Sequence, residues 1–298
     1  MKFIAYAQGG CCSVGELSPA GDAIYPIRVD SEAVGVLPLV IAAADGGRLP
    51  QGDRSASIPL DDVSVRAPIP RPRRNIFCVG KNYFDHAHEF ARSGFDSSAA
   101  AGAVPGSPII FSKVPECVIA DGEDVVIDPA VTAAVDYEAE LAVIIGRGGR
   151  GISKASAMDH VWGYTIVNDV TARDLQGRHK QWLIGKSLDT FCPMGPVAVT
   201  ADELDLQQTG VRCYVNGELR QNAMVSQLIF DIPTLIETLS SGITLYPGDV
   251  IATGTPAGVG IGFDPPRYLQ VGDEVTVEID GIGRLHNRFA AIDRHQEG

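Results

Sequence analysis

The sequence predicts a mixed α+β protein, because runs of strand type are broken by isolated helical segments and do not form a regular βαβ alternation. The chain has 298 residues, of which 45% are hydrophobic and 20% are charged. This is the composition of a globular protein and argues against a disordered chain. The length accommodates one large domain, or one large domain and a small one, with a well-buried core.

Residues 1–70 are predicted to form a small β-rich N-terminal domain. Short apolar runs are separated there by Gly, Pro, Asp and Ser, and they are Phe3–Ala7, Ala23–Val29 and Leu37–Ala44. The proline-rich segment 67–72 follows as a stiff connector, since each proline fixes its own φ and restrains the residue before it. We therefore place a domain boundary here, with residues 71–298 forming a second, larger domain.

The second domain is predicted to be rich in strands. The predicted strands are Ile76–Val79, Ile109–Ser112, Val125–Ile127, Asp136–Ile145, Val161–Asp169, Val197–Thr200, Val211–Val215, Val250–Thr253, Glu274–Ile279 and Gly283–Phe289. The predicted helices are Asn82–Arg92, Ser153–Asp159, Thr171–Arg178 and Ile232–Ser240. The Gly-, Ala- and Ser-rich segment Ser93–Ser107 is predicted to be a loop or a mobile flap.

The charge and the cysteines limit the partners and the compartment. With 24 Lys+Arg against 37 Asp+Glu, the net charge of −13 disfavours nucleic acid and anionic membranes as partners. No apolar stretch is long enough to span a bilayer, and the N-terminus does not have the pattern of a signal peptide. The six cysteines are scattered without a CxxC pair, which predicts reduced thiols and a cytoplasmic location.

Acidic residues on one predicted strand are the most informative signal. Glu138 and Glu140 lie two residues apart in Asp136–Ile145, so both side chains point to the same face. Asp169, at the end of the strand Val161–Asp169, offers a third carboxylate. Carboxylates beside a core repel each other unless a cation neutralises them, and oxygen ligands suit Mg²⁺ or Mn²⁺, or Ca²⁺ in their place. The alternative is a wet edge strand, with Asp169 as a helix N-cap.

A helix is predicted directly after Asp169. Arg173 and Gln176 share one face of it near the carboxylate, where a cation and an amide donor could hold a substrate carboxylate or an oxyanion. The alternative is a surface ion pair between Arg173 and Asp169.

On the predicted helix Asn82–Arg92, His86 and Glu89 are three residues apart and therefore neighbours. A Glu that accepts from one imidazole nitrogen leaves the other free to take a proton from water. The alternative is a pair of polar residues on a solvated helix, and His88 is expected to be exposed.

Two further segments are candidates for substrate contacts. Lys186 follows an apolar run, and a sheltered lysine there could pair with a carbonyl or carboxylate oxygen. The glycine-rich loop 253–260 follows a strand, and its N–H groups and the Thr255 hydroxyl could cradle a substrate carboxylate. The alternative for this loop is an ordinary turn.

Taken together, these motifs resemble those of the fumarylacetoacetate hydrolase family. The matching pieces are Phe77-Cys78-Val79-Gly80-Lys81-Asn82-Tyr83, Asp85-His86 with Glu89, Asp136-Tyr137-Glu138 with Glu140-Leu141, Asn168-Asp169-Val170-Thr171-Ala172-Arg173-Asp174, Gly185-Lys186-Ser187 and the segment 246–260. They occur in the family's order over about residues 75–289. Any one of them is weak, but jointly they are highly specific.

The resemblance implies a mixed β-roll catalytic domain, usually a homodimer, with Mg²⁺ or Mn²⁺ held by Glu138, Glu140 and Asp169. It implies that His86 and Glu89 act on water from a segment that orders as a lid. It also implies that Arg173, Gln176, Lys186 and Thr255 contact the substrate. The animal enzyme after which the family is named has one more aspartate ligand where this chain has Val79, so the chain looks like the shorter bacterial-type members.

The predicted activity is hydrolysis of a C–C bond in a 2,4-diketo acid of the acylpyruvate or fumarylpyruvate type. In this mechanism His86, oriented by Glu89, activates the water, and Lys186 and Gln176 stabilise the oxyanion. The alternative on the same site is a decarboxylase or isomerase of an oxaloacetate-like or 2-hydroxymuconate-type acid, which needs no attacking water. An alternative from another class is a binding protein with a structural Ca²⁺ site.

Overall fold

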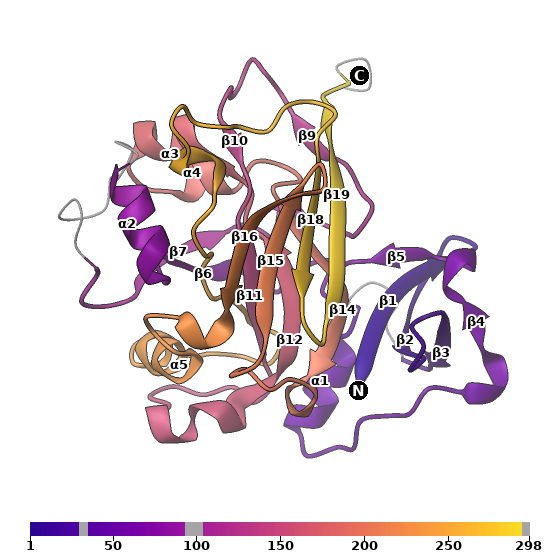
Figure 1. Cartoon of the computed structure of the whole chain (residues 1–298). Helices are drawn as coiled ribbons and strands as arrows, with labels where there is room; N and C mark the ends of the chain where they lie inside the picture. The colour runs from indigo at the N-terminus through magenta and orange to yellow at the C-terminus, as the bar shows by residue number, and fades with distance from the viewer. Residues whose placement is uncertain (30–34, 93–103, 294–298) are drawn as a thin grey trace.

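The computed structural model describes residues 1–29, 35–92 and 104–293. Within these ranges two open β-sheets form the body of the molecule, and short helices lie at its edges (Figure 1). The predicted α+β class is confirmed. Most of the predicted flap Ser93–Ser107 lies outside the described residues.

The N-terminal residues form a unit that stands to one side of the molecule (indigo in Figure 1). Its strands are β1 (Lys2–Gln8), β2 (Cys11–Leu17), β3 (Ala23–Ile27), β4 (Ile58–Pro59) and β5 (Ser64–Arg66). Leu37–Ala44, predicted as one of the apolar β runs, is the helix α1. That prediction was wrong because a short apolar run has no informative period, and Pro38 at the first turn is compatible with a helix.

The larger sheet holds twelve strands, in the order β4-β3-β2-β1-β14-β12-β11-β17-β6-β7 with β5 on β1 and β8 on β14. Its strands beyond the N-terminal unit are β6 (Ile76–Gly80), β7 (Ile109–Lys113), β8 (Val118–Ile119), β11 (Ala139–Ile145), β12 (Val161–Asn168), β14 (Cys192–Thr200) and β17 (Val250–Ala252). Strand β1 pairs antiparallel with β14 through Lys2 and Val199. The N-terminal strands therefore extend the same sheet that carries the central strands β11 and β12.

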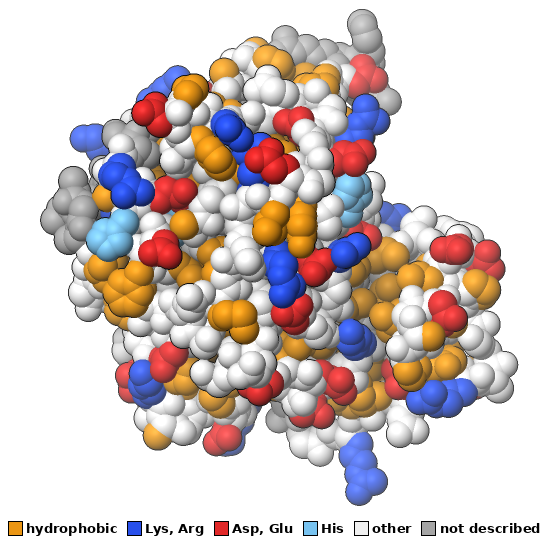
Figure 2. All heavy atoms as spheres, viewed as in Figure 1, with side chains coloured by type: hydrophobic (Ala, Val, Ile, Leu, Met, Phe, Trp, Pro, Cys, Tyr) orange, Lys and Arg blue, Asp and Glu red, His pale blue; other side chains and the backbone are white. Residues whose placement is uncertain are grey.

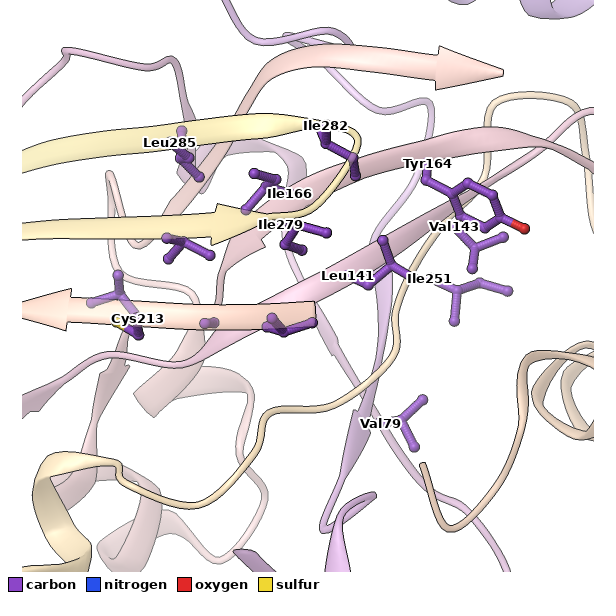
Figure 3. Packing of buried hydrophobic residues seen from close by; sticks show 14 of the residues in the cluster. Val79, Leu141, Val143, Tyr164, Ile166, Cys213, Ile251, Ile279, Ile282 and Leu285 are labelled. Carbon is purple, nitrogen blue, oxygen red and sulfur yellow. The ribbon is translucent and has the colours of Figure 1, made fainter. Parts of the chain in front are cut away.

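The second sheet has the order β16-β15-β18-β19-β9. Its strands are β9 (Val125–Ile127), β15 (Gly210–Val215), β16 (Glu218–Met224), β18 (Glu274–Ile279) and β19 (Gly283–Ala291), and a separate pair is formed by β10 (Val135–Asp136) and β13 (Thr171–Ala172). Figure 3 shows apolar side chains of β11 and β12, such as Leu141 and Ile166, packed toward Ile279 and Leu285 of the second sheet. The main core therefore lies between the two sheets.

The α-helices are short and peripheral. Besides α1, they are α2 (Phe84–Arg92), α3 (Arg173–His179), α4 (Leu183–Lys186) and α5 (Ile232–Ser240). The 3₁₀ turns are η1 (Arg54–Ala56), η2 (Leu60–Asp62), η3 (Pro115–Cys117), η4 (Lys154–His160), η5 (Ala201–Glu203), η6 (Val225–Gln227) and η7 (Gly260–Gly262). The predicted helix at Ser153–Asp159 is thus a 3₁₀ segment, whereas Ile232–Ser240 is the predicted helix.

Two general features of the described residues bear on possible partners. None of their helices combines the length and the apolar composition needed to cross a membrane. On the face shown in Figure 2, acidic and basic side chains are interspersed. That face therefore presents no broad field of one sign.

The sheet topology brings four chain segments to one place. Strands β11 and β12 are antiparallel, with Ala139 opposite Asn168. This register sets Glu138 and Glu140 beside Asp169. Strand β17 runs parallel to β6, with Ile251 opposite Phe77. Because parallel strands end at the same edge, the segments that follow them, residues 80–83 and 253–258, leave the sheet side by side.

Candidate functional site

Three carboxylates converge at the ends of the central strands. Glu138, Glu140 and Asp169 each offer an oxygen within 4.8 Å of the others, and all three side chains are buried. Strand β11 lies between β12 and β17 and is not an edge strand. The N-cap of α3 is Ala172, so Asp169 does not cap that helix. Both structural alternatives considered for these carboxylates are therefore wrong.

Two buried cations hold this cluster. Lys186 Nζ lies 2.7 Å from Glu138 Oε2 and 2.8 Å from Asp169 Oδ2. Arg173 donates from Nη1 to Glu138 Oε1 at 2.8 Å and from Nε to Asp136 Oδ2 at 2.8 Å. The alternative pairing of Arg173 with Asp169 is wrong, because α3 begins at Arg173 and a helical i,i+4 spacing does not include Asp169.

The pKa values of Glu138 and Glu140 are shifted in opposite directions. Burial opposes the charged form of Glu138, but Lys186 and Arg173 outweigh it and lower its pKa to about 2. For Glu140, burial is followed by the charges of Asp169 and Glu138, and together they raise its pKa well above the usual range. Negative charge is thus well compensated at Glu138 and poorly compensated at Glu140.

The donor set fits a divalent cation. The buried cations Lys113, Arg173 and Lys186 pair with three of the four buried carboxylates of the site, namely Asp136, Glu138 and Asp169. Among the described residues no lysine or arginine pairs with Glu140, which accepts the Gly254 N–H at 2.8 Å.

Asp169 Oδ1 also retains capacity for a ligand. It lies 2.7 Å from Lys113 Nζ but has no hydrogen-bond partner of good geometry in the described part of the chain. Oxygen donors with uncompensated charge favour Mg²⁺ or Mn²⁺ over a softer metal.

His86 and Glu89 form the expected pair on α2. His86 Nδ1 lies 3.2 Å from Glu89 Oε2, and His86 is 4% exposed. Glu89 also accepts the Gly258 N–H, at 3.0 Å to Oε1 and 3.2 Å to Oε2. The glutamate is therefore fixed from two sides, and the His86 Nε2 faces away from it. The alternative of two polar residues on a solvated helix is therefore wrong, because His86 is buried. His88 is exposed, as predicted.

Gly262 gives a test of the position of Glu89. A Cβ added at Gly262 would lie 2.0 Å from Glu89 Oε1, so Gly262→Ala must displace the carboxylate from His86. We expect kcat to fall by about 10-fold or more, because the imidazole loses the partner that fixes its tautomer. Gly242→Ala is the control, since its Cβ would meet nothing within 4 Å. Equal steady-state rates for both variants would contradict this arrangement.

The glycine-rich loop does not act as predicted. Its N–H groups were expected to cradle a substrate carboxylate, but several of them bind carboxylates of the protein. Gly254 donates to Glu140, Gly258 donates to Glu89, and Gly260 and Ile261 donate to Asp136 at 2.6 and 3.0 Å. These donors therefore hold the site together and are not available to a ligand.

Thr255 lies in this loop and is 2% exposed. Its Oγ1 accepts from Gln221 Nε2 at 2.8 Å, and Gln221 Oε1 accepts the Ala139 N–H at 3.0 Å. Gln221 on β16 thus ties Thr255 to the strand that carries the glutamates. Nothing in the sequence marks Gln221, because its partners are 34 and 82 residues away.

Lys113 was not predicted from the sequence as a residue of the site, and the role of Asp136 was predicted only in part. Lys113 is fully buried at the end of β7, where its ammonium group meets Asp169 and the carbonyls of Val170 and Lys186. The feature of the sequence that could have indicated it is the position of a lysine directly after the apolar strand Ile109–Ser112. Asp136 was predicted only to extend the acidic row, yet it anchors Arg173.

A small cavity reaches the carboxylate cluster at Glu138. Every predicted substrate contact lines it, namely Arg173, Gln176, Lys186 and Thr255, together with His86. Arg173 Nη2 is buried and has no hydrogen-bond partner among the described residues. Arg173 and Gln176 do share one face, since Arg173 Nη1 donates to Gln176 Oε1 at 3.1 Å.

An aromatic wall closes the other side of the cavity. The Trp182 ring lies 6.1 Å from that of Phe90 and 5.1 Å from that of Phe111, centre to centre. A Cβ at Gly80 would come within 2.5 Å of the Trp182 ring, so only glycine permits this approach. The cavity is therefore cationic and polar at its floor and apolar along its wall.

Comparisons with known proteins agree with this geometry. Residues 75–290 match a sequence profile described as "Fumarylacetoacetate (FAA) hydrolase C-terminal". The chain is 53% identical over 231 residues to oxaloacetate tautomerase YisK of Bacillus subtilis (strain 168), covering 77% of this chain and 74% of the relative. It is 44% identical over 234 residues to the mitochondrial oxaloacetate tautomerase FAHD2A of Homo sapiens, covering 78% and 71% of the two chains.

Solved structures show the same fold. A fumarylacetoacetate hydrolase from psychrophilic Exiguobacterium antarcticum superposes with a TM-score of 0.84 at 41% identity, covering 98% of this chain and 100% of that one. A 2-hydroxyhepta-2,4-diene-1,7-dioate isomerase from Mycobacterium marinum gives a TM-score of 0.77 at 33% identity, covering 99% and 100%. The similarity thus extends over both sheets and the N-terminal unit.

Proposed function

The chain belongs to the fumarylacetoacetate hydrolase family of enzymes, and from this premise we propose that it interconverts the enol and keto forms of a 2-oxo dicarboxylic acid of the oxaloacetate type. This is the isomerase form of the alternative derived from the sequence. The named activities of the relatives support it better than they support hydrolysis of an acylpyruvate. A metal-assisted isomerisation uses the same cluster of carboxylates and needs no attacking water.

The buried donor at Arg173 carries this proposal. Its guanidinium is 1% exposed, lines the cavity and leaves Nη2 without a partner among the described residues. A buried unpaired donor is costly, so the site is complete only when an acceptor binds. A carboxylate of the substrate would supply that acceptor, and the charge-assisted bond would fix the substrate against the floor of the cavity.

Glu138, Glu140 and Asp169 would hold the divalent ion. When bound, the ion supplies Lewis-acid chemistry by withdrawing electron density from the oxygens of a 2-oxo acid. Lys186 neutralises Glu138 and Asp169 from the side of the cavity. Lys113 does the same for Asp169 from the core. The two lysines thus fix the orientation of the carboxylates.

The proton transfer is assigned to His86. Its Nδ1 faces Glu89, which leaves Nε2 to give a proton to C3 of the enol, while the 2-hydroxyl group loses one proton. In the reverse direction Nε2 removes the proton from C3. Glu89 fixes the tautomer and stabilises the imidazolium. The aromatic wall of Phe90, Phe111 and Trp182 limits the access of water to this step.

We expect the purified protein to accelerate the enol-to-keto conversion of oxaloacetate, followed as the loss of enol absorbance, with Mg²⁺ or Mn²⁺ present. Addition of EDTA should abolish the acceleration, and re-addition of the metal should restore it. Oxaloacetate, pyruvate and carbon dioxide are quantified in the same reactions. Acceleration only of pyruvate formation would favour a decarboxylase, and cleavage of acylpyruvates without any effect on oxaloacetate would favour the predicted hydrolase.

We also propose the organisation expected from the sequence. Residues 1–70 form the N-terminal domain, residues 71–298 form the catalytic domain, and the chain acts as a cytoplasmic homodimer on a small anionic keto acid. The start of the family match at residue 75 supports this boundary. Sedimentation velocity measures the oligomeric state.

A further inference from the structure

We propose that Lys81 recognises the distal carboxylate of a dicarboxylic substrate and so sets the selectivity of the site for diacids over monoacids. This inference rests on the proposed function, because it assigns the second carboxylate of an oxaloacetate-type acid.

Lys81 belongs to the same cavity as the candidate catalytic residues. Its side chain is 3% exposed and lines the cavity together with His86 and Arg173. The Lys81 Nζ lies 5.5 Å from the centre of the Phe90 ring, and the Cζ of Arg173 lies 5.8 Å from the same centre. Two cations of the cavity thus lie near the same aromatic ring.

The two carboxylates of the substrate would be bound by different cations of the cavity. Arg173 and Lys186 pair with Glu138 at the floor, and the Nη2 of Arg173, which has no hydrogen-bond partner within the described ranges, can donate to one carboxylate there. An oxaloacetate-type acid carries a second carboxylate, three carbon–carbon bonds from the first. A buried carboxylate needs its own cation. Lys81 lines the same cavity as Arg173 and Lys186, with its ammonium 5.5 Å from the centre of the Phe90 ring, and so adds a further positive charge to the lining.

The backbone holds Lys81 in an unusual conformation. Its φ is +54°, in the left-handed region that non-glycine residues rarely adopt. The next residue, Asn82, is fixed on both sides of the chain, since its Nδ2 donates to Thr253 O at 2.8 Å and its Oδ1 accepts the Phe230 N–H at 2.8 Å. Gly80 packs against Trp182. These neighbours determine where the Lys81 side chain enters the cavity.

Lys81→Met tests the inference with a pair of substrates. The enol of oxaloacetate is compared with the enol of acetylpyruvate, in which an acetyl group replaces the distal carboxylate at nearly the same size. Loss of a charge-assisted hydrogen bond corresponds to about 10- to 100-fold. We therefore expect kcat/KM for oxaloacetate to fall by that factor in Lys81→Met, with the value for acetylpyruvate changed less than about 3-fold.

Lys180→Met is the matched control. Lys180 also has a left-handed backbone, with φ of +59°, but its side chain is exposed and does not line the cavity. This variant removes the same charge and places methionine in the same conformation, so both substrates should be turned over as in the wild type. An equal loss for both substrates in Lys81→Met would overturn the inference and make Lys81 structural.

Binding separates this inference from the proposed function. If the wild type does not isomerise oxaloacetate, the proposed function fails, and calorimetric titration with malate and with 2-hydroxybutanoate still tests Lys81. We expect the Mn²⁺-loaded wild type to bind malate at least about 10-fold more tightly than 2-hydroxybutanoate, and Lys81→Met to lose this difference. A preference for malate that persists in Lys81→Met, or that is absent from the wild type, would overturn the inference.

Discussion

Replacement of Glu140 by glutamine is expected to abolish metal-dependent turnover without lowering the thermal stability of the metal-free protein. Burial and the charges of Asp169 and Glu138 raise the pKa of Glu140, so its charged form destabilises the folded state above the ordinary pKa of a glutamate. The neutral amide removes that cost and still accepts the Gly254 N–H. Without this ligand the Lewis acid is lost, and we expect a rate loss of about 10³-fold or more.

Glu138→Gln provides the contrast, because Glu138 is the compensated carboxylate. Removing its charge leaves Lys186 and Arg173 without their shared partner in a buried place. Breaking a buried ion pair in this way costs about 3–5 kcal/mol of stability. Unfolding of both variants in EDTA and calorimetric titration with Mn²⁺ measure the two effects. A Glu140→Gln protein that is as unstable as Glu138→Gln, or that binds Mn²⁺ like the wild type, would refute the assignment.

His86→Ala is expected to lower kcat by about 10²- to 10⁴-fold, which is the usual contribution of a positioned acid–base group. The substitution lies on α2, outside the carboxylate cluster, and should leave Mn²⁺ binding unchanged. The remaining activity should come from the metal and the cationic groups, which do not depend on His86. Initial rates of enol loss and Mn²⁺ titrations with the same preparation give both quantities.

His88→Ala is the control for this prediction. His88 lies on the same helix but is exposed to solvent. It should therefore have wild-type kcat and metal affinity. If His86→Ala also kept undiminished turnover, another group would have to transfer the proton. The assignment of His86 as the acid–base group oriented by Glu89 would then be wrong.

The central strands of the fold could be predicted from sequence because they are buried on both faces and are rich in β-branched residues. Strands β11 and β12 have no exposed position along their length, and both lie where the apolar runs placed them. Strand β16 (Glu218–Met224) was not predicted, because it is a polar strand that pairs with β15 at the edge of its sheet. A sequence shows hydrophobic burial, but it does not show which polar segment completes a sheet edge.

The candidate site was predictable where neighbours are close in sequence and not where they are distant. The spacing of Glu138 and Glu140 along a strand, and of His86 and Glu89 along a helix, follows from the local period. The binding of Asp136 to Arg173 joins residues 37 apart, and no pattern marks it. The use of the glycine-loop N–H groups by the protein's own carboxylates also depends on the folded arrangement, and it reversed the prediction for that loop.

The division of the site between sheet and helix has a consequence for changing its chemistry by protein engineering. The carboxylates lie at the ends of β11 and β12, each of which has a hydrogen-bonded strand on both sides, whereas the histidine lies on the peripheral helix α2 (Figure 1). A library confined to residues 81–92 would vary the acid–base groups while the central strands kept their register. Exchange of this one short segment between relatives is therefore the most economical route from one reaction of a keto acid to another.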